Sequence, residues 1–233
     1  DDDGTDSAVT LTTATNDFTG AVSVTDGGGA VSLTDASGLV LGTVNADSLT
    51  LITDGSVTQT GALMVATTTT IDADGDDDGT DSAVTLTNAS NDFTGAVSVT
   101  DGGAAVSVTD ASSLILGTVN ADSLTLITDG SVTQTGAVTV ATTTTIDADG
   151  DDDGTDSAVT LTTATNDFTG AVSVTDGGGA VSLTDASGLI LGTVNADSLA
   201  LVTDGTVTQT GAVMVATTTT IDADGDDDGT DSA

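Results

Sequence analysis

Residues 33–55 read LTDASGLVLGTVNADSLTLITDG. Leu, Val and Ile alternate here with Thr and Ser, and Gly, Asn and Asp separate the apolar segments. Alternation with a period of two is typical of half-buried strands, and β-branched residues fit a pleated surface better than a helix. The chain has no long helical pattern. The stretch therefore predicts short β-strands joined by tight turns.

The stretch belongs to a tandem repeat. Residues 1–75, 76–150 and 151–225 align without a gap, and 226–233 begin a fourth copy. The chain begins and ends inside the same motif, so we expect it to be a window of a longer array. A repeat period of this length predicts either a solenoid or a string of small domains.

The differences between copies predict which positions face inward. Copies one and two differ at eight positions, and copies one and three at five. Three apolar positions stay apolar and are expected in the core; they are Leu33 (Val108), Val40 (Ile115 and Ile190) and Leu63 (Val138 and Val213). Met64 is replaced by Thr139, so this position is expected to face solvent.

Two interleaved series of strand-like segments run through each repeat. The first series starts at Ala8, Ala30, Ser48 and Thr68, and after a shorter step it starts again at Ala83. The second starts at Gly20, Gly38 and Ser56. This rhythm predicts a β-solenoid with about four coils per repeat. With strands about 4.8 Å apart, each repeat advances the structure by roughly 19 Å.

The alternative fold is a string of small β-sandwich domains, one in each repeat. The pairs Asp26-Gly27 and Asp54-Gly55 are good hairpin turns, which favours this alternative. Sandwiches of this size usually pack around bulky aromatic anchors. The chain has three Phe and neither Trp nor Tyr, which favours the solenoid.

The charge balance excludes several classes of partner. The formal charge is −37, all of it from Asp, and Lys, Arg and His are absent. A nucleic-acid-binding protein needs a basic face, and so does a protein attracted to anionic lipid heads. No run approaches the roughly 18 apolar residues of a membrane-spanning helix. Cysteine is absent, so the redox compartment cannot be inferred. The expected partners are divalent cations and further copies of the chain.

The segment IDADGDDDGTDSA, residues 71–83, places six Asp residues within ten positions. Asp74, Asp76, Asp78 and Gly79 match the D-x-D-x-D-G opening of a helix–loop–helix calcium loop. The twelfth position is Thr85 where that loop has Glu, so we expect an open, partial Ca²⁺ site. The candidate ligands are Asp72, Asp74, Asp76, Asp78, Asp81, Asp147, Asp149, Asp151, Asp153, Asp156, Asp222, Asp224, Asp226, Asp228 and Asp231.

The alternative for this block is a solvated acidic loop that binds cations only diffusely. Other Asp residues are better explained as turn formers than as ligands, because Asp side chains stabilise turns. They are Asp17, Asp26, Asp35, Asp47 and Asp54.

The segments at 33–55, 56–66 (SVTQTGALMVA) and 86–101 (LTNASNDFTGAVSVTD) resemble the repeats of filamentous-haemagglutinin-type and autotransporter-like bacterial adhesins. The resemblance covers most of each repeat and leaves out only the Asp block. It implies a right-handed parallel β-helix, export from the cell, and a mechanical or adhesive role at the cell surface.

Composition and repetition together favour a structural protein over an enzyme. Without His, Cys, Lys, Arg or Tyr, an activated nucleophile or an oxyanion clamp is hard to assemble. We expect a repeat region of a secreted fibre, sheath or giant adhesin, located outside the cell and stabilised by Ca²⁺. The alternatives are an adhesin stalk of sandwich domains and an ice- or glycan-binding surface. Thr-rich segments such as residues 66–74 suggest a flat ice-binding face, but we expect their Thr positions not to match from coil to coil.

Overall fold

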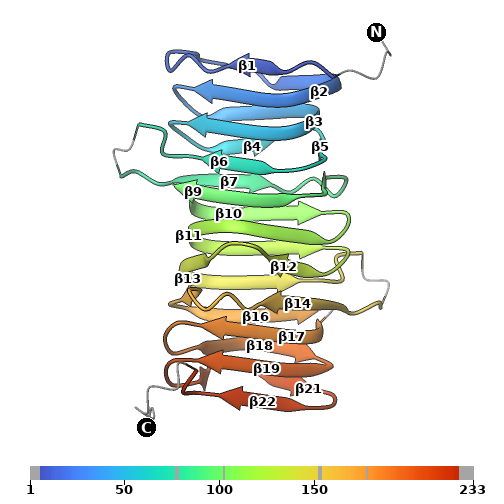
Figure 1. Cartoon of the computed structure of the whole chain (residues 1–233), viewed down its shortest axis with the longest axis vertical. Helices are drawn as coiled ribbons and strands as arrows, with labels where there is room; N and C mark the ends of the chain where they lie inside the picture. The colour runs from blue at the N-terminus through green and yellow to red at the C-terminus, as the bar shows by residue number, and fades with distance from the viewer. Residues whose placement is uncertain (1–5, 77–78, 102, 152–153, 177, 226–233) are drawn as a thin grey trace.

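A computed structural model describes residues 6–76, 79–101, 103–151, 154–176 and 178–225. This part of the chain is all β, without a helix (Figure 1). Its strands are β1 Val9–Leu11, β2 Val22–Asp35, β3 Leu39–Thr53, β4 Val57–Gln59, β5 Leu63–Val65, β6 Thr69–Asp72, β7 Ser82–Leu86, β8 Asp92–Phe93, β9 Ala96–Asp101, β10 Gly103–Asp110, β11 Leu114–Thr128, β12 Val132–Gln134, β13 Val138–Asp147, β14 Ser157–Leu161, β15 Asp167–Phe168, β16 Ala171–Asp176, β17 Gly178–Asp185, β18 Ile190–Ala196, β19 Ser198–Thr203, β20 Thr208–Gln209, β21 Val213–Val215 and β22 Thr219–Asp222.

The strands stack in parallel, each on a strand of the next coil. Every pairing between the described strands is parallel. The result is a β-solenoid of about 11 turns. Sandwich domains are built from antiparallel sheets, so the alternative of one sandwich per repeat is wrong. The right-handed sense implied by the resemblance is also the general rule for parallel crossover connections.

The first series of the repeat forms a continuous stack along one side of the solenoid. Residues Val9, Val31, Leu49 and Thr69 of this series are paired in this order, and the stack then continues through Val97, Leu116 and Gln134, which belong to the second series. The spacing of the first series up to Thr68 is therefore confirmed as the coil length. The shorter step to Ala83 is not a coil, because Thr69 pairs with Val97, well beyond Ala83 on the chain.

At the Asp block the two series exchange sides. Val84 is the equivalent of Val9 one repeat later, yet it pairs with Val57 of the second series. Val159 is the equivalent of Val9 two repeats later, and it lies on the original side again. It pairs with Val132, which belongs to the same strand as Gln134 of the stack that began at Val9. Seven coils thus carry the chain through two repeats. The expected number of about four coils per repeat is refined to three and a half, or an advance of roughly 17 Å.

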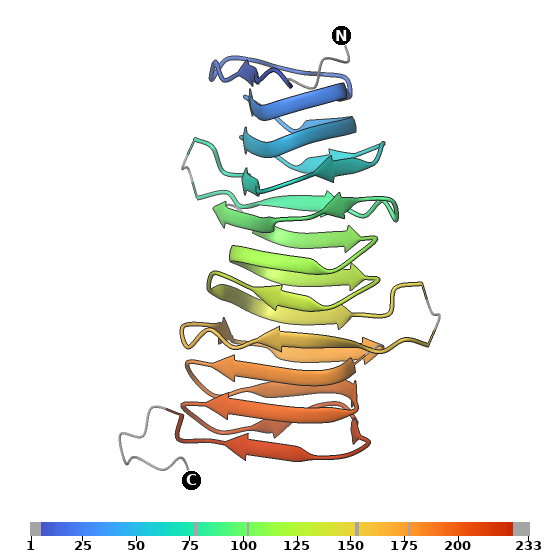
Figure 2. The ribbon, with the colours of Figure 1, turned by 45° about the vertical axis from the view of Figure 1, so that its right-hand side comes forward.

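A half-integral number of coils places equivalent positions of neighbouring repeats on opposite sides of the solenoid. In Figure 1 the segment that leaves β6 projects to the left and the one that leaves β13 projects to the right. Figure 2, turned by 45°, shows the same alternation. The acidic segments therefore do not form one row along the solenoid.

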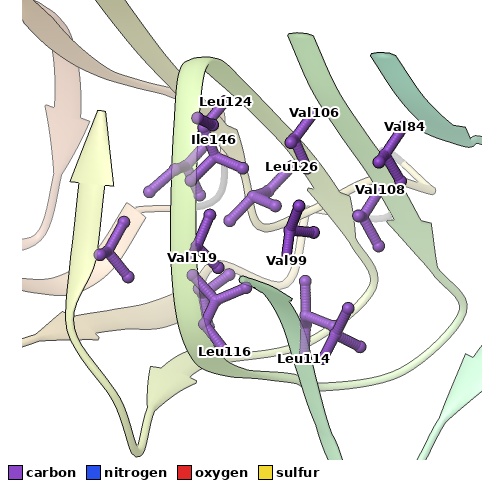
Figure 3. Packing of buried hydrophobic residues seen from close by; sticks show 14 of the residues in the cluster. Val84, Val99, Val106, Val108, Leu114, Leu116, Val119, Leu124, Leu126 and Ile146 are labelled. Atoms are coloured by element: carbon purple, nitrogen blue, oxygen red, sulfur yellow. The ribbon is translucent and has the colours of Figure 1, made fainter. Parts of the chain in front are cut away.

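The core is a column of aliphatic side chains between the stacked strands. Figure 3 shows residues of β7, β9, β10, β11 and β13 converging in this interior, among them Val84, Val99 and Leu126. The largest fully buried side chains are those of Phe93 and Phe168. A thin column of this kind suits Val, Leu and Ile because each coil adds only one layer to the core.

The inward positions expected at Leu33 and Leu63 are confirmed, since both residues are at most 1% exposed. Met64 is 43% exposed and faces outward as expected. The inward position expected for Val40, Ile115 and Ile190 is wrong: each is half-buried. Leu39 and Leu41 point inward instead, because residues of a strand alternate between its two faces.

Candidate metal centre

The Asp-rich segment is an insertion at one corner of a coil. The stretch of chain between the stacked residues Thr69 and Val97, which contains this segment, is longer than the stretch between Leu49 and Thr69 in the preceding coil. The segment leaves the end of β6 on one side of the solenoid and enters β7 on the other. In the next coil the same corner lies between the end of β9, at Asp101, and the start of β10.

Backbone hydrogen bonds hold the start of this segment between the two neighbouring coils. The amide of Ala73 donates to the carbonyl oxygen of Asp101 in the following coil, at 3.0 Å. The amide of Gly75 donates to the carbonyl oxygen of Thr53 in the preceding coil, at 2.9 Å. Asp74, between them, is therefore fixed at the level of its own coil.

The return of the chain is fixed through Gly79. Its φ of 79° lies in the left-handed region, which glycine adopts without a steric penalty. Its amide donates to Oδ2 of Asp74, at 3.1 Å. This bond brings the two ends of the Asp block together around one carboxylate.

Two groups of three carboxylates meet at Asp74. One comprises Asp74, Asp81 and Asp101, and the other comprises Asp54, Asp74 and Asp76. In each group the three residues offer oxygen atoms that all lie within 4.8 Å of one another. Asp54 belongs to the preceding coil and Asp101 to the following one, so carboxylates of three successive coils gather here.

Asp74 is the most enclosed member of both groups. It is 4% exposed, and its Oδ1 has no hydrogen-bond partner among the described residues. Two unit charges at the 4.8 Å limit repel by about 0.9 kcal/mol in water and about 3.5 kcal/mol at an effective dielectric constant of about 20. No Lys, Arg or His exists in the chain to offset this repulsion. A cation from solution is the natural counter-charge.

The second repeat reproduces the first group. Asp149, Asp156 and Asp176 offer oxygens within the same 4.8 Å limit. Asp149 is 5% exposed, and its Oδ2 accepts the amide of Gly154 at 3.1 Å. Gly154 has a φ of 80°, and Ala148 donates to the carbonyl of Asp176 at 3.1 Å. The loop geometry is therefore a property of the repeat.

The structure brings together only part of the predicted ligand set. Five of the predicted residues lie in these groups; they are Asp74, Asp76, Asp81, Asp149 and Asp156. Three others each accept the amide two positions further on, as turn formers do; they are Asp72, Asp147 and Asp222. The amide of Asp151 donates to Oδ1 of Asp129 at 3.1 Å, and that of Asp224 donates to Asp222. The remaining predicted ligands, Asp78, Asp153, Asp226, Asp228 and Asp231, lie outside the described residues.

Sequence reasoning missed Asp54, Asp101 and Asp176. On the sequence, Asp54 is better explained as a turn former, and so is Asp26, which occupies the same position of the first repeat as Asp101 in the second and Asp176 in the third. A local motif could not reveal them, because each comes from a different coil than the Asp block. Their signal is the coil register, which brings Asp101 opposite Asp72 in the β6–β9 pairing.

Asp35 and its equivalents Asp110 and Asp185 are turn residues, as expected. Oδ2 of Asp110 accepts the amide of Phe93 at 2.9 Å, and Oδ1 accepts the amide of Ser112 at 2.7 Å. Desolvation by burial raises the pKa of Asp110 above its usual value, while these hydrogen bonds act in the opposite direction. The carboxylate links two coils through backbone amides and is not a metal-ligand candidate.

One outward row of hydroxyl groups is matched from coil to coil, although Thr lies opposite Thr in this row only at Thr50 and Thr70. The row consists of Thr10, Ser32, Thr50, Thr70 and Ser98. The neighbouring outward row is irregular, since it passes from Thr34 to Ile52 and Asp72. A flat face for ice needs more than one regular row, so the ice alternative gains no support; β-propensity explains the Thr residues.

Fold and acidic corners together define the class of this chain: a tandem-repeat β-solenoid with Asp-rich insertions. The chain belongs to the family described as "Repeats of unknown function (DUF5649)", whose profile matches residues 3–25, 28–100, 103–175 and 178–228. These segments recur with the same period as the repeat, but they begin at other residues than our division at 1–75, 76–150 and 151–225. That division stays a prediction. No solved structure matches the chain. In the described residues, no helix has the length and apolar character needed to cross a membrane.

One relative is a protein named "Outer membrane protein A" from Rickettsia rickettsii, with 39% identity over 189 residues. The match covers 75% of this chain and 8% of that protein, so the chain corresponds to a small part of its relative. Family and relative fit a repeat surface protein. The narrower likeness to filamentous-haemagglutinin-type and autotransporter-like adhesins stays a prediction.

Proposed function

We propose that this chain is a structural segment of a bacterial surface fibre, sheath or giant adhesin, in which the solenoid acts as a stiff extracellular spacer. The observation that carries this proposal is the unbroken parallel stacking of coils, without a closed domain, throughout the described residues. The relative named as an outer membrane protein supports a location in the cell envelope. The lack of His, Cys and Tyr supports a structural role over a catalytic one.

The mechanism of such a spacer is mechanical. Hydrogen bonds between parallel strands point from coil to coil and therefore run along the long axis, where they resist extension together. The buried aliphatic column resists bending because its side chains are close-packed. A charge of −37 keeps neighbouring solenoids apart in low salt, and divalent cations allow them to pack laterally into fibres.

Length measurements on chains of increasing repeat number test this function. We expect each added repeat to lengthen the particle by roughly 17 Å while its cross-section stays constant. Small-angle X-ray scattering gives both quantities, and the same chains in urea are the control for an unfolded polymer. A cross-section that grows with repeat number, or a length that does not increase in proportion, contradicts the spacer. Antibodies that label intact cells of the source organism would test the surface location.

The proposed spacer also binds Ca²⁺ at its Asp-rich corners, which relieves the repulsion between clustered carboxylates. We expect millimolar Ca²⁺ to raise the thermal unfolding midpoint above that measured in NaCl of the same ionic strength, and a chelator to reverse the gain. A ligand at about 100 times its Kd adds about 2.7 kcal/mol to the free energy of unfolding for each site. Circular dichroism at increasing temperature measures the effect. Equal midpoints in the two salts would mean that cations act only by screening.

A further inference from the structure

We infer that Asp74, Asp81 and Asp101 bind one Ca²⁺ ion that ties the Asp-rich corner to the following coil, and that Asp149, Asp156 and Asp176 bind a second. This inference rests on the proposed Ca²⁺ binding and assigns its ligands. Asp101 and Asp176 come from the next coil, so the site is completed only when two coils are stacked.

The separation of the carboxylates matches a single ion. Ca²⁺ binds oxygen at about 2.3 to 2.6 Å, so two oxygens on one ion are at most about 5 Å apart. In each of the two groups all three ligand oxygens lie within 4.8 Å of one another. Three monodentate carboxylates leave coordination positions for water or carbonyl oxygens, which the irregular shell of Ca²⁺ accepts more readily than the strict octahedron of Mg²⁺.

The burial of Asp74 is independent support for a ligand. A buried carboxylate normally has a partner for each oxygen, because an unpartnered charge is costly to desolvate. Asp74 is 4% exposed, and its Oδ2 accepts the amide of Gly79, whereas Oδ1 accepts no hydrogen bond from the part of the chain that the structure describes. No basic side chain exists anywhere in the chain to fill this position. A bound cation satisfies it.

The competing group, Asp54 with Asp74 and Asp76, shares Asp74 and joins it to the preceding coil. Among the described residues this arrangement is found in the first Asp block only, while the group containing Asp101 recurs with Asp176 in the second. The group that recurs is therefore the better assignment for the ion. The variant Asp54→Asn distinguishes the two groups, because it removes a ligand from the competing group only.

The position of the site explains how a bound ion would stabilise the solenoid. The Asp block interrupts the regular coil length, since the chain between the stacked partners Thr69 and Val97 is longer than in the preceding coil. Next to the site the β6–β9 pairing ends with Asp72 opposite Asp101, so the ion continues the connection between these coils beyond the last strand pair. The two sites lie on opposite sides of the solenoid, as the projecting segments of Figure 2 show.

Calorimetric titration of the whole chain with CaCl₂, in NaCl that screens diffuse binding, tests the assignment. The wild-type chain is expected to bind two Ca²⁺ ions at its two carboxylate groups. Asp101→Asn with Asp176→Asn removes one charged ligand from each site, and should weaken Ca²⁺ binding about tenfold or more. Asp81→Asn with Asp156→Asn should weaken Ca²⁺ binding to a similar extent, because it removes the ligand at the other end of the loop.

The matched control is Asp122→Asn with Asp197→Asn, which removes the same charge from exposed positions outside these groups. This control and Asp54→Asn should both keep two sites of wild-type affinity. If the Asp101 and Asp176 variant binds as tightly as the control, the ligand assignment is wrong while Ca²⁺ binding by the Asp block survives. If the wild-type chain releases no heat beyond a MgCl₂ titration and a buffer blank, the proposed Ca²⁺ binding itself is wrong. The spacer function is judged separately, by particle length.

Discussion

Alanine at Gly95 is expected to destabilise the solenoid by about 3 kcal/mol or more, whereas alanine at Gly20, the equivalent position one repeat earlier, should change stability by less than about 1 kcal/mol. A Cβ atom at Gly95 would overlap the carbonyl oxygen of Thr67 in the preceding coil. Backbone atoms cannot turn away as a flexible side chain can, so the coils must separate locally. At Gly20 nothing lies within 4 Å of the added Cβ.

Urea denaturation followed by circular dichroism measures this difference, and hydrogen exchange of the amides next to Thr67 shows whether the damage is local. Contacts in a solenoid join neighbouring coils only, so a lesion in the middle should open the adjacent coils first. Gly170 is enclosed by the carbonyl of Thr142 in the same way and should behave like Gly95. Equal stability of the Gly95 and Gly20 variants would show that the coils are not packed as closely as described.

Asn91→Ala is expected to cost about 3 to 5 kcal/mol, because Asn91 is a fully buried connection between three coils. Its Oδ1 accepts the amide of Leu63 at 3.0 Å in the preceding coil. Its Nδ2 donates to the carbonyl of Leu86 at 3.2 Å and to that of Thr109, in the following coil, at 3.1 Å. Alanine leaves these buried backbone groups without partners, and each such group costs about 1 to 3 kcal/mol.

Asn16 is the matched control for Asn91. It occupies the same position of the repeat, but within the described residues its side chain donates only to the carbonyl of Leu11, at 3.0 Å, in a solvent-exposed bond. Asn16→Ala should therefore cost about 0.5 to 1.5 kcal/mol, the usual net value of one hydrogen bond. Asn166 repeats these bonds with Val138, Leu161 and Thr184 and should show the large cost. If Asn16→Ala and Asn91→Ala lowered the free energy of unfolding in urea by similar amounts, the side chain of Asn91 would not be connecting stacked coils.

Much of the fold could be predicted from the sequence, because strand periodicity and the repeat are local properties. The spacing of Val9, Val31 and Leu49 indicated the true coil length, and Met64 was placed correctly on the outside. The inward direction of Val40 was wrong because its neighbours Leu39 and Leu41 are apolar too. When both faces of a strand are apolar, alternation alone does not say which of them is buried.

The candidate site was less predictable than the fold. The Asp block identified Asp74 and Asp81, because six acidic residues in one segment need a counter-charge wherever they lie. Asp101 could not be found in this way, since it lies far from Asp81 on the chain and ends an ordinary strand. Asn91 was hidden for the same reason: on the chain it is one polar residue in a turn, and in the solenoid it is enclosed by coils on both sides.

By itself, the sequence determined the strands, the aliphatic core, the period of the repeat and the excess of negative charge, because each depends on which residues are near neighbours on the chain. Only the tertiary structure decided that two repeats make seven coils and that the acidic corners alternate between opposite sides. Coil register depends on the length of the corners as well as on the strands, and the Asp block lengthens one corner in each repeat. That added length moves each following repeat by half a turn and brings Asp101 beside Asp74.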